Sequence, residues 1–197
     1  MKLEIPPGEF DAYLFDLDGT IADSMPLHFR AWTRAVEEHG GTFPEELFYA
    51  WAGIPHERTV ELLNERFGYA LPVAETARRK EALFEAARDD VKPVPAVLAE
   101  IERHYGHAPL AVVSGSPHAS ILRTLGSLGL LEKFAAIVGA EDAPRGKPHP
   151  DPFLRAAELL SVAPGRCLVF EDAEPGIVAA TAAGMKWVRV PTARAAP

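Results

Sequence analysis

Short apolar runs alternate with longer amphipathic stretches over much of the chain. The runs at Tyr13–Phe15, Leu110–Val113 and Cys167–Phe170 have the length and composition of buried strands, and weaker runs at 134–138 and 187–190 predict two more. Because strands and helices alternate after residue 93, the pattern predicts an α/β fold with a doubly wound, mainly parallel, five-stranded sheet. We expect the strand order, numbered along the chain, to be 3-2-1-4-5.

The helices expected around these strands have recognisable boundaries. One begins after Ser24, with proline in its first turn, and ends near His39 before a pair of glycines. Others are expected from about Pro117 to Leu125, over 152–160 and over 175–183.

The segment between the first two strands is much longer than an ordinary crossover connection. Residues 43–90 have helical spacing and contain no convincing strand. We therefore expect residues 22–92 to form an inserted, all-helical cap, and residues 1–21 and 93–197 to form the core.

One helix of this segment has a lysine within its apolar stripe. The stripe follows alternating spacings of four and three residues, as on one helix face, through Val73, Ala77, Lys80, Phe84, Ala87 and Val91. Such a lysine either extends its ammonium from the edge of the stripe into water or directs it into a cleft. The pattern alone leaves both interpretations open.

Polar and acidic residues follow three of the expected strands. Asp16 and Asp18 follow the first, Ser114 follows the second, and Glu171 and Asp172 follow the fourth. With the first strand central, the carboxyl ends of these strands lie together, where open parallel sheets bind their ligands. Several carboxylates in one small space require compensation, which a hard cation with oxygen ligands, such as Mg²⁺, supplies. Taken alone, Glu171 and Asp172 are also typical of the acidic first turn of a helix.

Charge and cysteine content narrow the classes of partner. The formal net charge is −8, which argues against a nucleic-acid partner, because such partners usually need a basic surface. The chain has a single cysteine, Cys167, and we expect a reducing, cytoplasmic location. We find no export signal and no apolar run long enough to span a membrane, and we expect a monomer or a weak oligomer.

Four motifs in order resemble those of the haloacid dehalogenase superfamily of phosphotransferases. The first is Asp16-Leu17-Asp18-Gly19-Thr20 after an apolar strand, and the second is Ser114 after another. Lys147, in Gly146-Lys147-Pro148, resembles the third, and the stretch 170–177 around Glu171-Asp172 resembles the fourth.

The resemblance implies roles for these residues. Asp16 would attack phosphorus and form an aspartyl-phosphate, while Asp18 would protonate the leaving oxygen and later activate water. Ser114 and nearby backbone N–H groups, including that of Gly115, would hold phosphate oxygens with help from the following helix N-terminus. Lys147 would offset the negative charge of the nucleophile and the phosphate.

The same resemblance implies a Mg²⁺ site. Asp16, the backbone carbonyl of Asp18 and Asp172 would be ligands, with Glu171 as a further ligand or as a support for the others. Dehalogenases of the superfamily lack the second aspartate of the first motif, so the presence of Asp18 argues against dehalogenation.

The cap is similar to the β-phosphoglucomutase-like branch of the superfamily. By that resemblance, the residue matching His28 helps to position Asp18, and the residue matching Lys80 contacts the substrate. The branch's mutases carry an arginine in the cap loop where this chain has His56, with Arg58 two residues later. A guanidinium is hard to replace in gripping a second phosphate, so His56 and Arg58 are weaker candidates for substrate contacts. A histidine packed in the cap and an arginine on its surface are the alternatives.

These features together are most similar to small bacterial sugar phosphatases, such as fructose-1-phosphate phosphatases. We expect a Mg²⁺-dependent phosphatase that acts on small phosphorylated sugars. The alternatives are an isomerase that interconverts β-glucose 1-phosphate and glucose 6-phosphate, and a catalytically silent binding protein.

Overall fold

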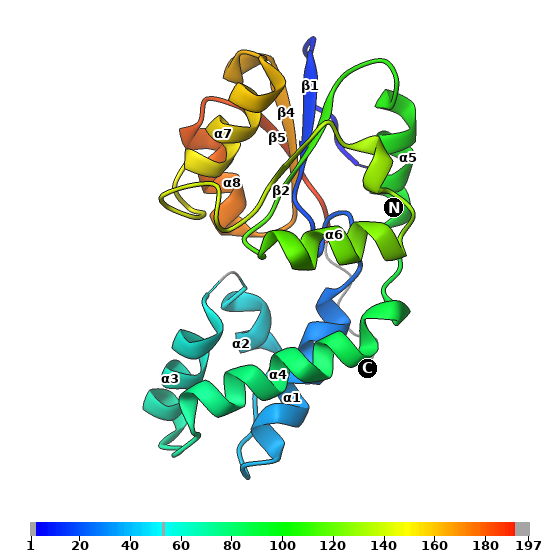
Figure 1. Cartoon of the computed structure of the whole chain (residues 1–197). Helices are drawn as coiled ribbons and strands as arrows, with labels where there is room; N and C mark the ends of the chain where they lie inside the picture. Colours follow the sequence, from blue (N-terminus) through cyan, green and yellow to red (C-terminus); the bar gives the residue numbers. More distant parts are fainter. Residues whose placement is uncertain (1–2, 53, 192–197) are drawn as a thin grey trace. The chain divides into compact units, whose positions relative to one another are not determined.

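The computed structural model describes residues 3–52 and 54–191, which form two compact units (Figure 1). The sheet unit contains the described residues up to Asp23 and from Lys92 onward, and the helical unit contains Ser24–Val91. Residues 1–2, 53 and 192–197, which the expected core and cap ranges include, lie outside the described residues. No helix in the described part of the chain combines the length and the apolar character needed to cross a membrane.

The sheet unit is built on five parallel strands in the order β3-β2-β1-β4-β5, as the sequence predicted. Strands from opposite ends of the chain therefore lie side by side: in Figure 1 the blue β1 lies between the green β2 and the orange β4. Tyr13 of β1 is in register with Leu110 of β2 and with Leu168 of β4. The strands are β1 (Ala12–Phe15), β2 (Leu110–Val113), β3 (Ala136–Val138), β4 (Cys167–Glu171) and β5 (Lys186–Arg189).

Helices cover both faces of this sheet, with α7 and α8 on one face and α5 and α6 on the other (Figure 1). They are α5 (Pro95–His104), α6 (His118–Ser127), α7 (Asp151–Leu160) and α8 (Glu174–Ala182), with short 3-10 turns at η2 (Leu131–Lys133) and η3 (Pro164–Arg166). The covering explains why the strands contain apolar runs and do not alternate, since both faces are buried.

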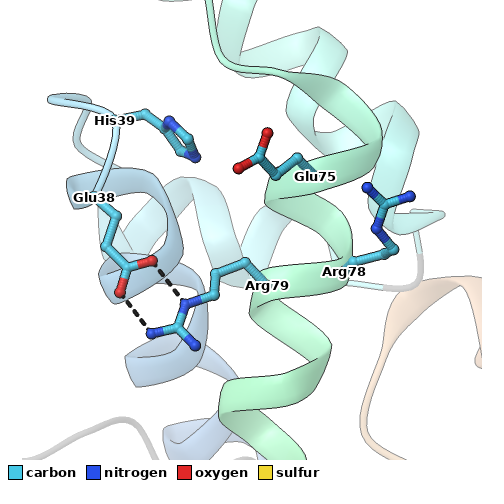
Figure 2. Close-up of a pocket in the computed structure, with 5 residues that line it drawn as sticks. All are labelled: Glu38, His39, Glu75, Arg78 and Arg79. Atoms are coloured by element: carbon cyan, nitrogen blue, oxygen red, sulfur yellow. Dashed lines mark hydrogen bonds and ion pairs between the residues drawn. The ribbon is translucent and has the colours of Figure 1, made fainter.

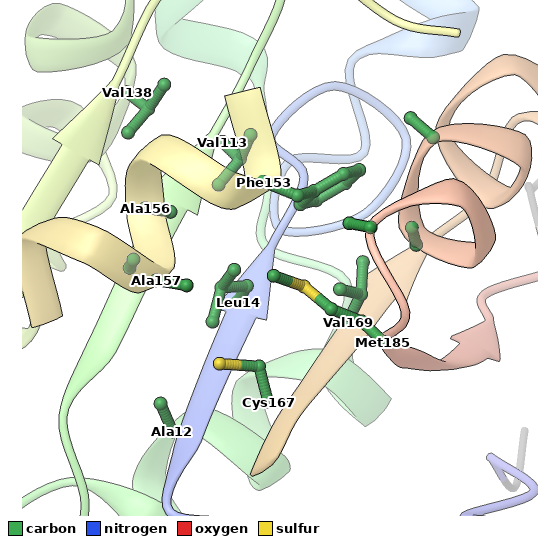
Figure 3. Packing of buried hydrophobic residues seen from close by; sticks show 14 residues of the cluster. Ala12, Leu14, Val113, Val138, Phe153, Ala156, Ala157, Cys167, Val169 and Met185 are labelled. Atoms are coloured by element: carbon green, nitrogen blue, oxygen red, sulfur yellow. The ribbon is translucent and has the colours of Figure 1, made fainter. Parts of the chain in front are cut away.

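The apolar core between the sheet and its α7–α8 face uses small and large side chains in combination (Figure 3). Leu14 of β1 and Val169 of β4 are completely buried there, as is Phe153 of α7. Alanines of α7 and α8 let the helices approach the strands closely, and burial of this apolar surface is the main stabilising contribution to the unit.

The helical unit consists of helices only among its described residues: α1 (Met25–Glu37), α2 (Glu45–Ala50), α3 (His56–Phe67), α4 (Val73–Ala87) and the 3-10 turn η1 (Arg88–Asp90). Its aromatic core includes Trp32, Phe43 and Phe48. The end of α1 is tied to α4 by two hydrogen bonds from the Arg79 guanidinium to the Glu38 carboxylate, of 2.7 and 2.8 Å (Figure 2).

A surface pocket of about 530 Å³ adjoins this ion pair and is lined by Glu38, His39, Glu75, Arg78 and Arg79 (Figure 2). All five residues are exposed, and none is a predicted catalytic or metal-binding residue. The pocket is therefore not where the chemistry implied by the sequence would take place.

The fold differs from the sequence prediction in several details. The helix α5 was not predicted, and β3 begins at Ala136, two residues later than expected. Glu171 is the last residue of β4 and lies inside the ladder, where the prediction placed it after the strand. This position buries its side chain among the strand ends, because a residue in a central strand has neighbours on both sides.

Candidate active site

The carboxyl ends of β1 and β4 bring Lys147 between two buried carboxylates. Its ammonium donates hydrogen bonds to Asp16 Oδ1 at 2.7 Å and to Glu171 Oε2 at 2.6 Å. A third bond, of 3.0 Å, goes to the backbone oxygen of Val113 at the end of β2. The lysine therefore links the ends of three adjacent strands, and the loop that carries it comes from between β3 and α7.

Asp172 completes a cluster of three carboxylates. One oxygen from each of Asp16, Glu171 and Asp172 lies within 4.8 Å of the others. The Thr20 hydroxyl donates a 3.3 Å hydrogen bond to Asp172 Oδ1. Gly19 allows this approach, since a Cβ there would lie 2.3 Å from Asp172 Oδ2, and its φ of +90° is one that other residues rarely adopt.

Burial and the negative charge of Glu171 both raise the pKa values of Asp16 and Asp172. Burial raises the pKa of Asp16 well above its ordinary value, and the negative charge of Glu171 raises it further. Burial, followed by Glu171, raises the pKa of Asp172 to about 7. Burial alone would lower the pKa of Lys147, but Asp16 and Glu171 raise it above its ordinary value, so the ammonium stays charged. One lysine does not neutralise three carboxylates, and a set of hard oxygen ligands with excess negative charge suits Mg²⁺.

Asp18 lies apart from this cluster and contacts the loop after β2. The Ser116 hydroxyl donates a 3.2 Å hydrogen bond to Asp18 Oδ2. The same loop is ordered by a 3.1 Å bond from the Ser116 N–H to Ser114 Oγ. β1 ends at Phe15, but the Asp16 N–H still bonds to Phe170 O of β4 at 3.0 Å, and Asp18 lies in the turn that follows.

Ser114 is buried and its backbone N–H bonds to Val138 O at 2.9 Å, which extends the β2–β3 ladder by one residue. Gly115 is exposed, and no atom would lie within 4 Å of a Cβ added there. The first N–H of α6, that of His118, donates to the Glu141 carboxylate at 3.2 and 3.3 Å. The helix N-terminus expected to help hold phosphate thus has an internal anion at its first donor.

The contacts of Ser116 and Thr20 with aspartates, and of Lys147 with Glu171, were not predicted. Ser116 and Thr20 are close in sequence to the predicted residues, within Ser114-Gly115-Ser116 and Asp18-Gly19-Thr20. Their hydroxyl groups next to acidic motifs were the available signal. Which acid each hydroxyl would contact depends on how the loops turn, and the residue pattern does not contain that information.

The helical unit brings three of its four candidate residues into one aromatic cluster. His28 stacks on Phe84 with ring centroids 3.7 Å apart, and the Lys80 ammonium lies 5.3 Å from the centroid of the same ring. His56 Nε2 is 3.1 Å from Lys80 Nζ. Arg58, the fourth candidate, instead forms ion pairs with two glutamates of its own helix, Glu61 and Glu65, each at 2.9 Å.

The raised pKa values predict how the stability of the metal-free protein depends on pH. A folded-state pKa above the ordinary value means that the folded state binds the proton more tightly, so this stabilisation is present at low pH. The stabilisation that comes from Asp172 is lost as the pH rises from 3.8, the ordinary pKa of an aspartate, through about 7. We expect the free energy of unfolding, measured by urea denaturation in EDTA, to fall over this range, and to fall less in Asp172→Asn.

The exposed Asp89 in the helical unit provides the matched control. Asp89→Asn should retain the wild-type pH dependence. The free energy of unfolding could instead rise between pH 4 and pH 7, equally in the wild type and in Asp172→Asn. That result would contradict a raised pKa of Asp172 in the folded state.

Comparison with known proteins identifies the family. The model of the haloacid dehalogenase-like hydrolase family matches residues 10–184. The chain is 38% identical to the fructose-1-phosphate phosphatase YqaB of Escherichia coli over 178 residues, which cover 90% of this chain and 94% of that protein. It is 32% identical to the β-phosphoglucomutase of Bacillus subtilis, over 88% of this chain and 80% of the relative.

A solved structure, the β-phosphoglucomutase of Clostridium difficile, superimposes with a TM-score of 0.78 at 26% identity, covering 90% of this chain and 83% of that one. The family match and the strand order both agree with the expectation from the sequence. The chain belongs to the haloacid dehalogenase-like hydrolase family.

Proposed function

We propose that the protein is a Mg²⁺-dependent phosphatase that hydrolyses small phosphorylated sugars. The observation that carries the proposal is the position of Lys147, whose ammonium bonds to Asp16 and to Glu171 at the ends of adjacent parallel strands. A cation next to a carboxylate nucleophile, within a group of hard oxygen ligands, is suited to phosphoryl transfer. That reaction depends mainly on positioning and on stabilisation of negative charge.

The proposed reaction has two displacements at phosphorus. An oxygen of Asp16 attacks, the bond from phosphorus to the sugar oxygen breaks, and Asp18 gives its proton to that oxygen. Asp18, now ionised, takes a proton from water, whose oxygen attacks the aspartyl-phosphate and displaces the Asp16 carboxylate. The products are the free sugar and inorganic phosphate, and both aspartates return to their starting states.

The surrounding groups hold the transferring phosphate. Lys147 places positive charge beside Asp16 Oδ1, and Ser114 with the N–H of Gly115 would bind phosphate oxygens. Asp16, Asp172 and the Asp18 carbonyl would hold Mg²⁺, which when bound supplies further positive charge to the phosphate oxygens. Glu171 is assigned as a support, because its Oε2 is bonded to Lys147 and its Oε1 accepts the Ala173 N–H at 3.1 Å.

The substrate class is inferred from the activities named for similar proteins and from the presence of the helical unit. The relative with 38% identity is a phosphatase of fructose 1-phosphate, a small phosphorylated sugar. We assign the helical unit, Ser24–Val91, as a mobile cap that closes over the substrate, with Lys80 contacting the sugar and His28 positioning Asp18.

We also place the protein in the cytoplasm, in keeping with its single, buried cysteine.

Release of inorganic phosphate from a panel of phosphorylated sugars, sugar alcohols and non-sugar metabolites tests the proposal directly. We expect turnover of sugar monophosphates with Mg²⁺ and its loss in EDTA, with recovery when Mg²⁺ is restored. Turnover that is unchanged in EDTA would contradict the metal assignment. No phosphate release from any member of the panel, or from a generic aryl phosphate, would exclude a phosphatase and leave the isomerase and the binding protein as the alternatives.

The 32% identity to a β-phosphoglucomutase keeps an isomerase as the second candidate. A mutase must grip a second phosphate, for which a bidentate guanidinium is well suited. This chain has His56 at the aligned position, in contact with Lys80. Conversion of β-glucose 1-phosphate to glucose 6-phosphate, stimulated by the bisphosphate, would establish the isomerase. Phosphate release without that interconversion would exclude it.

A further inference from the structure

Two polar side chains, His56 of α3 and Glu81 of α4, lie next to the Lys80 ammonium. His56 Nε2 lies 3.1 Å from Lys80 Nζ, which is hydrogen-bond distance. Glu81 Oε2 lies 3.3 Å from the same ammonium and 3.8 Å from His56 Nδ1. His56 and Glu81 therefore flank the cation, and the carboxylate is near both it and the second ring nitrogen.

The chemistry of the two partners determines the protonation state of His56. An ammonium has three donors and no acceptor, so His56 Nε2 must contribute a lone pair. The ring is then neutral and carries its proton on Nδ1, the nitrogen nearer to Glu81. His56 is also the first residue of α3, where the partial positive charge of the helix N-terminus disfavours a positively charged imidazole ring.

The cluster also has aromatic contacts. Lys80 Nζ lies 5.8 Å from the ring centroid of Trp32 in α1 and 5.3 Å from that of Phe84 in α4. Trp32 also meets the His56 ring edge-on at 5.6 Å. Ring faces attract a cation but allow it a range of positions, whereas a hydrogen bond to a ring nitrogen has a defined direction.

We propose that His56 is a positioning residue that directs the Lys80 ammonium through its Nε2 lone pair. This inference rests on the proposed function, in which Lys80 contacts the sugar. Glu81 favours the required tautomer by lying near Nδ1, and Trp32 fixes the ring plane. Without His56, the ammonium is drawn to Glu81 and to the aromatic faces, away from the direction needed for the substrate.

Two substitutions at position 56 separate this role from general packing. His56→Leu fills much of the same space but has no acceptor, and we expect it to raise KM for the sugar phosphate about tenfold, with kcat changed much less. His56→Gln keeps an acceptor and should restore most of the affinity. Neither variant should change KM for an aryl phosphate that lacks a sugar.

Glu57→Leu is the matched control, since Glu57 is the exposed next residue of the same helix. It should retain the wild-type KM for both substrates. The proposal is overturned if His56→Leu retains the wild-type KM while Lys80→Met does not, or if His56→Gln is as impaired as His56→Leu.

A measurement without substrate distinguishes failure of this proposal from failure of the proposed function. Nitrogen NMR of the His56 imidazole at pH 8 should show an unprotonated Nε2 and a protonated Nδ1 in the wild type. Lys80→Met should shift the tautomer balance towards a protonated Nε2. A protonated Nε2 in the wild type would overturn the positioning role even if the enzyme is active, while the expected tautomer in a protein without phosphatase activity would count against the proposed function alone.

Discussion

Replacing Asp16 with asparagine is expected to reduce phosphate release by at least about 10⁴-fold, because the amide cannot form the acyl-phosphate bond. The substitution is nearly isosteric and keeps an oxygen near the Lys147 ammonium, which lies 2.7 Å from Asp16 Oδ1. The fold should therefore survive. Steady-state phosphate release, with thermal unfolding as the folding check, measures the effect.

Asp11→Asn is the control, because Asp11 is an exposed aspartate just before β1 whose carboxylate pairs with Arg166. It should retain wild-type turnover. Asp18→Asn should still accept a phosphoryl group slowly from an activated aryl phosphate, and intact-mass spectrometry would detect the phosphorylated enzyme. Wild-type turnover by Asp16→Asn would show that another group is the nucleophile.

Replacing Gly176 with alanine is expected to damage both activity and stability. A Cβ at Gly176, in the first turn of α8, would lie 2.0 Å from Glu171 Oε2. The Glu171 side chain cannot easily move, because it is 1% exposed and both of its oxygens accept hydrogen bonds. We expect unfolding to become easier by about 1–3 kcal/mol through overpacking. Displacement of Lys147, which bonds to Glu171, should lower kcat about 100-fold.

Gly126→Ala is the matched control, because it makes the same substitution where a Cβ meets no other atom. Gly126 lies inside α6, and no atom would be within 4 Å of an added Cβ. Alanine is favoured over glycine in a helix by about 1 kcal/mol, so this variant should be slightly more stable with unchanged kcat. Equal behaviour of the two variants would show that the close contact between Gly176 and Glu171 does not govern the site.

The parallel sheet and the acidic residues at its strand ends could be predicted, because the apolar runs alternate with helical stretches and the acids follow those runs directly. The central position of β1 is enough to bring Asp16 near Glu171 and Asp172. The helix α5 was not predicted because, after its proline start, only Val97 and Ile101 form a clear buried stripe.

Contacts between loops were beyond prediction for a different reason. The bond from Ser116 to Asp18 joins residues 98 positions apart, and it depends on two turns whose geometry no residue spacing specifies. The contact of His56 with Lys80 depends on the packing of α3 against α4 in the same way. Spacing along one helix placed Lys80 in the apolar stripe, but it could not show what would face the ammonium from a neighbouring helix.

The central place of β1 also affects how the protein folds during its synthesis. Ala12 pairs with Cys167, so β1 leaves the ribosome long before β4, one of its two neighbours in the sheet, has been made. The helical unit is continuous in sequence, so it can pack as soon as Ser24–Val91 has emerged. Meanwhile β1 has unpaired, apolar edges that are open to association with other nascent chains. Biogenesis of the sheet therefore depends on protection of this strand, by chaperones or by dilution, until β4 appears.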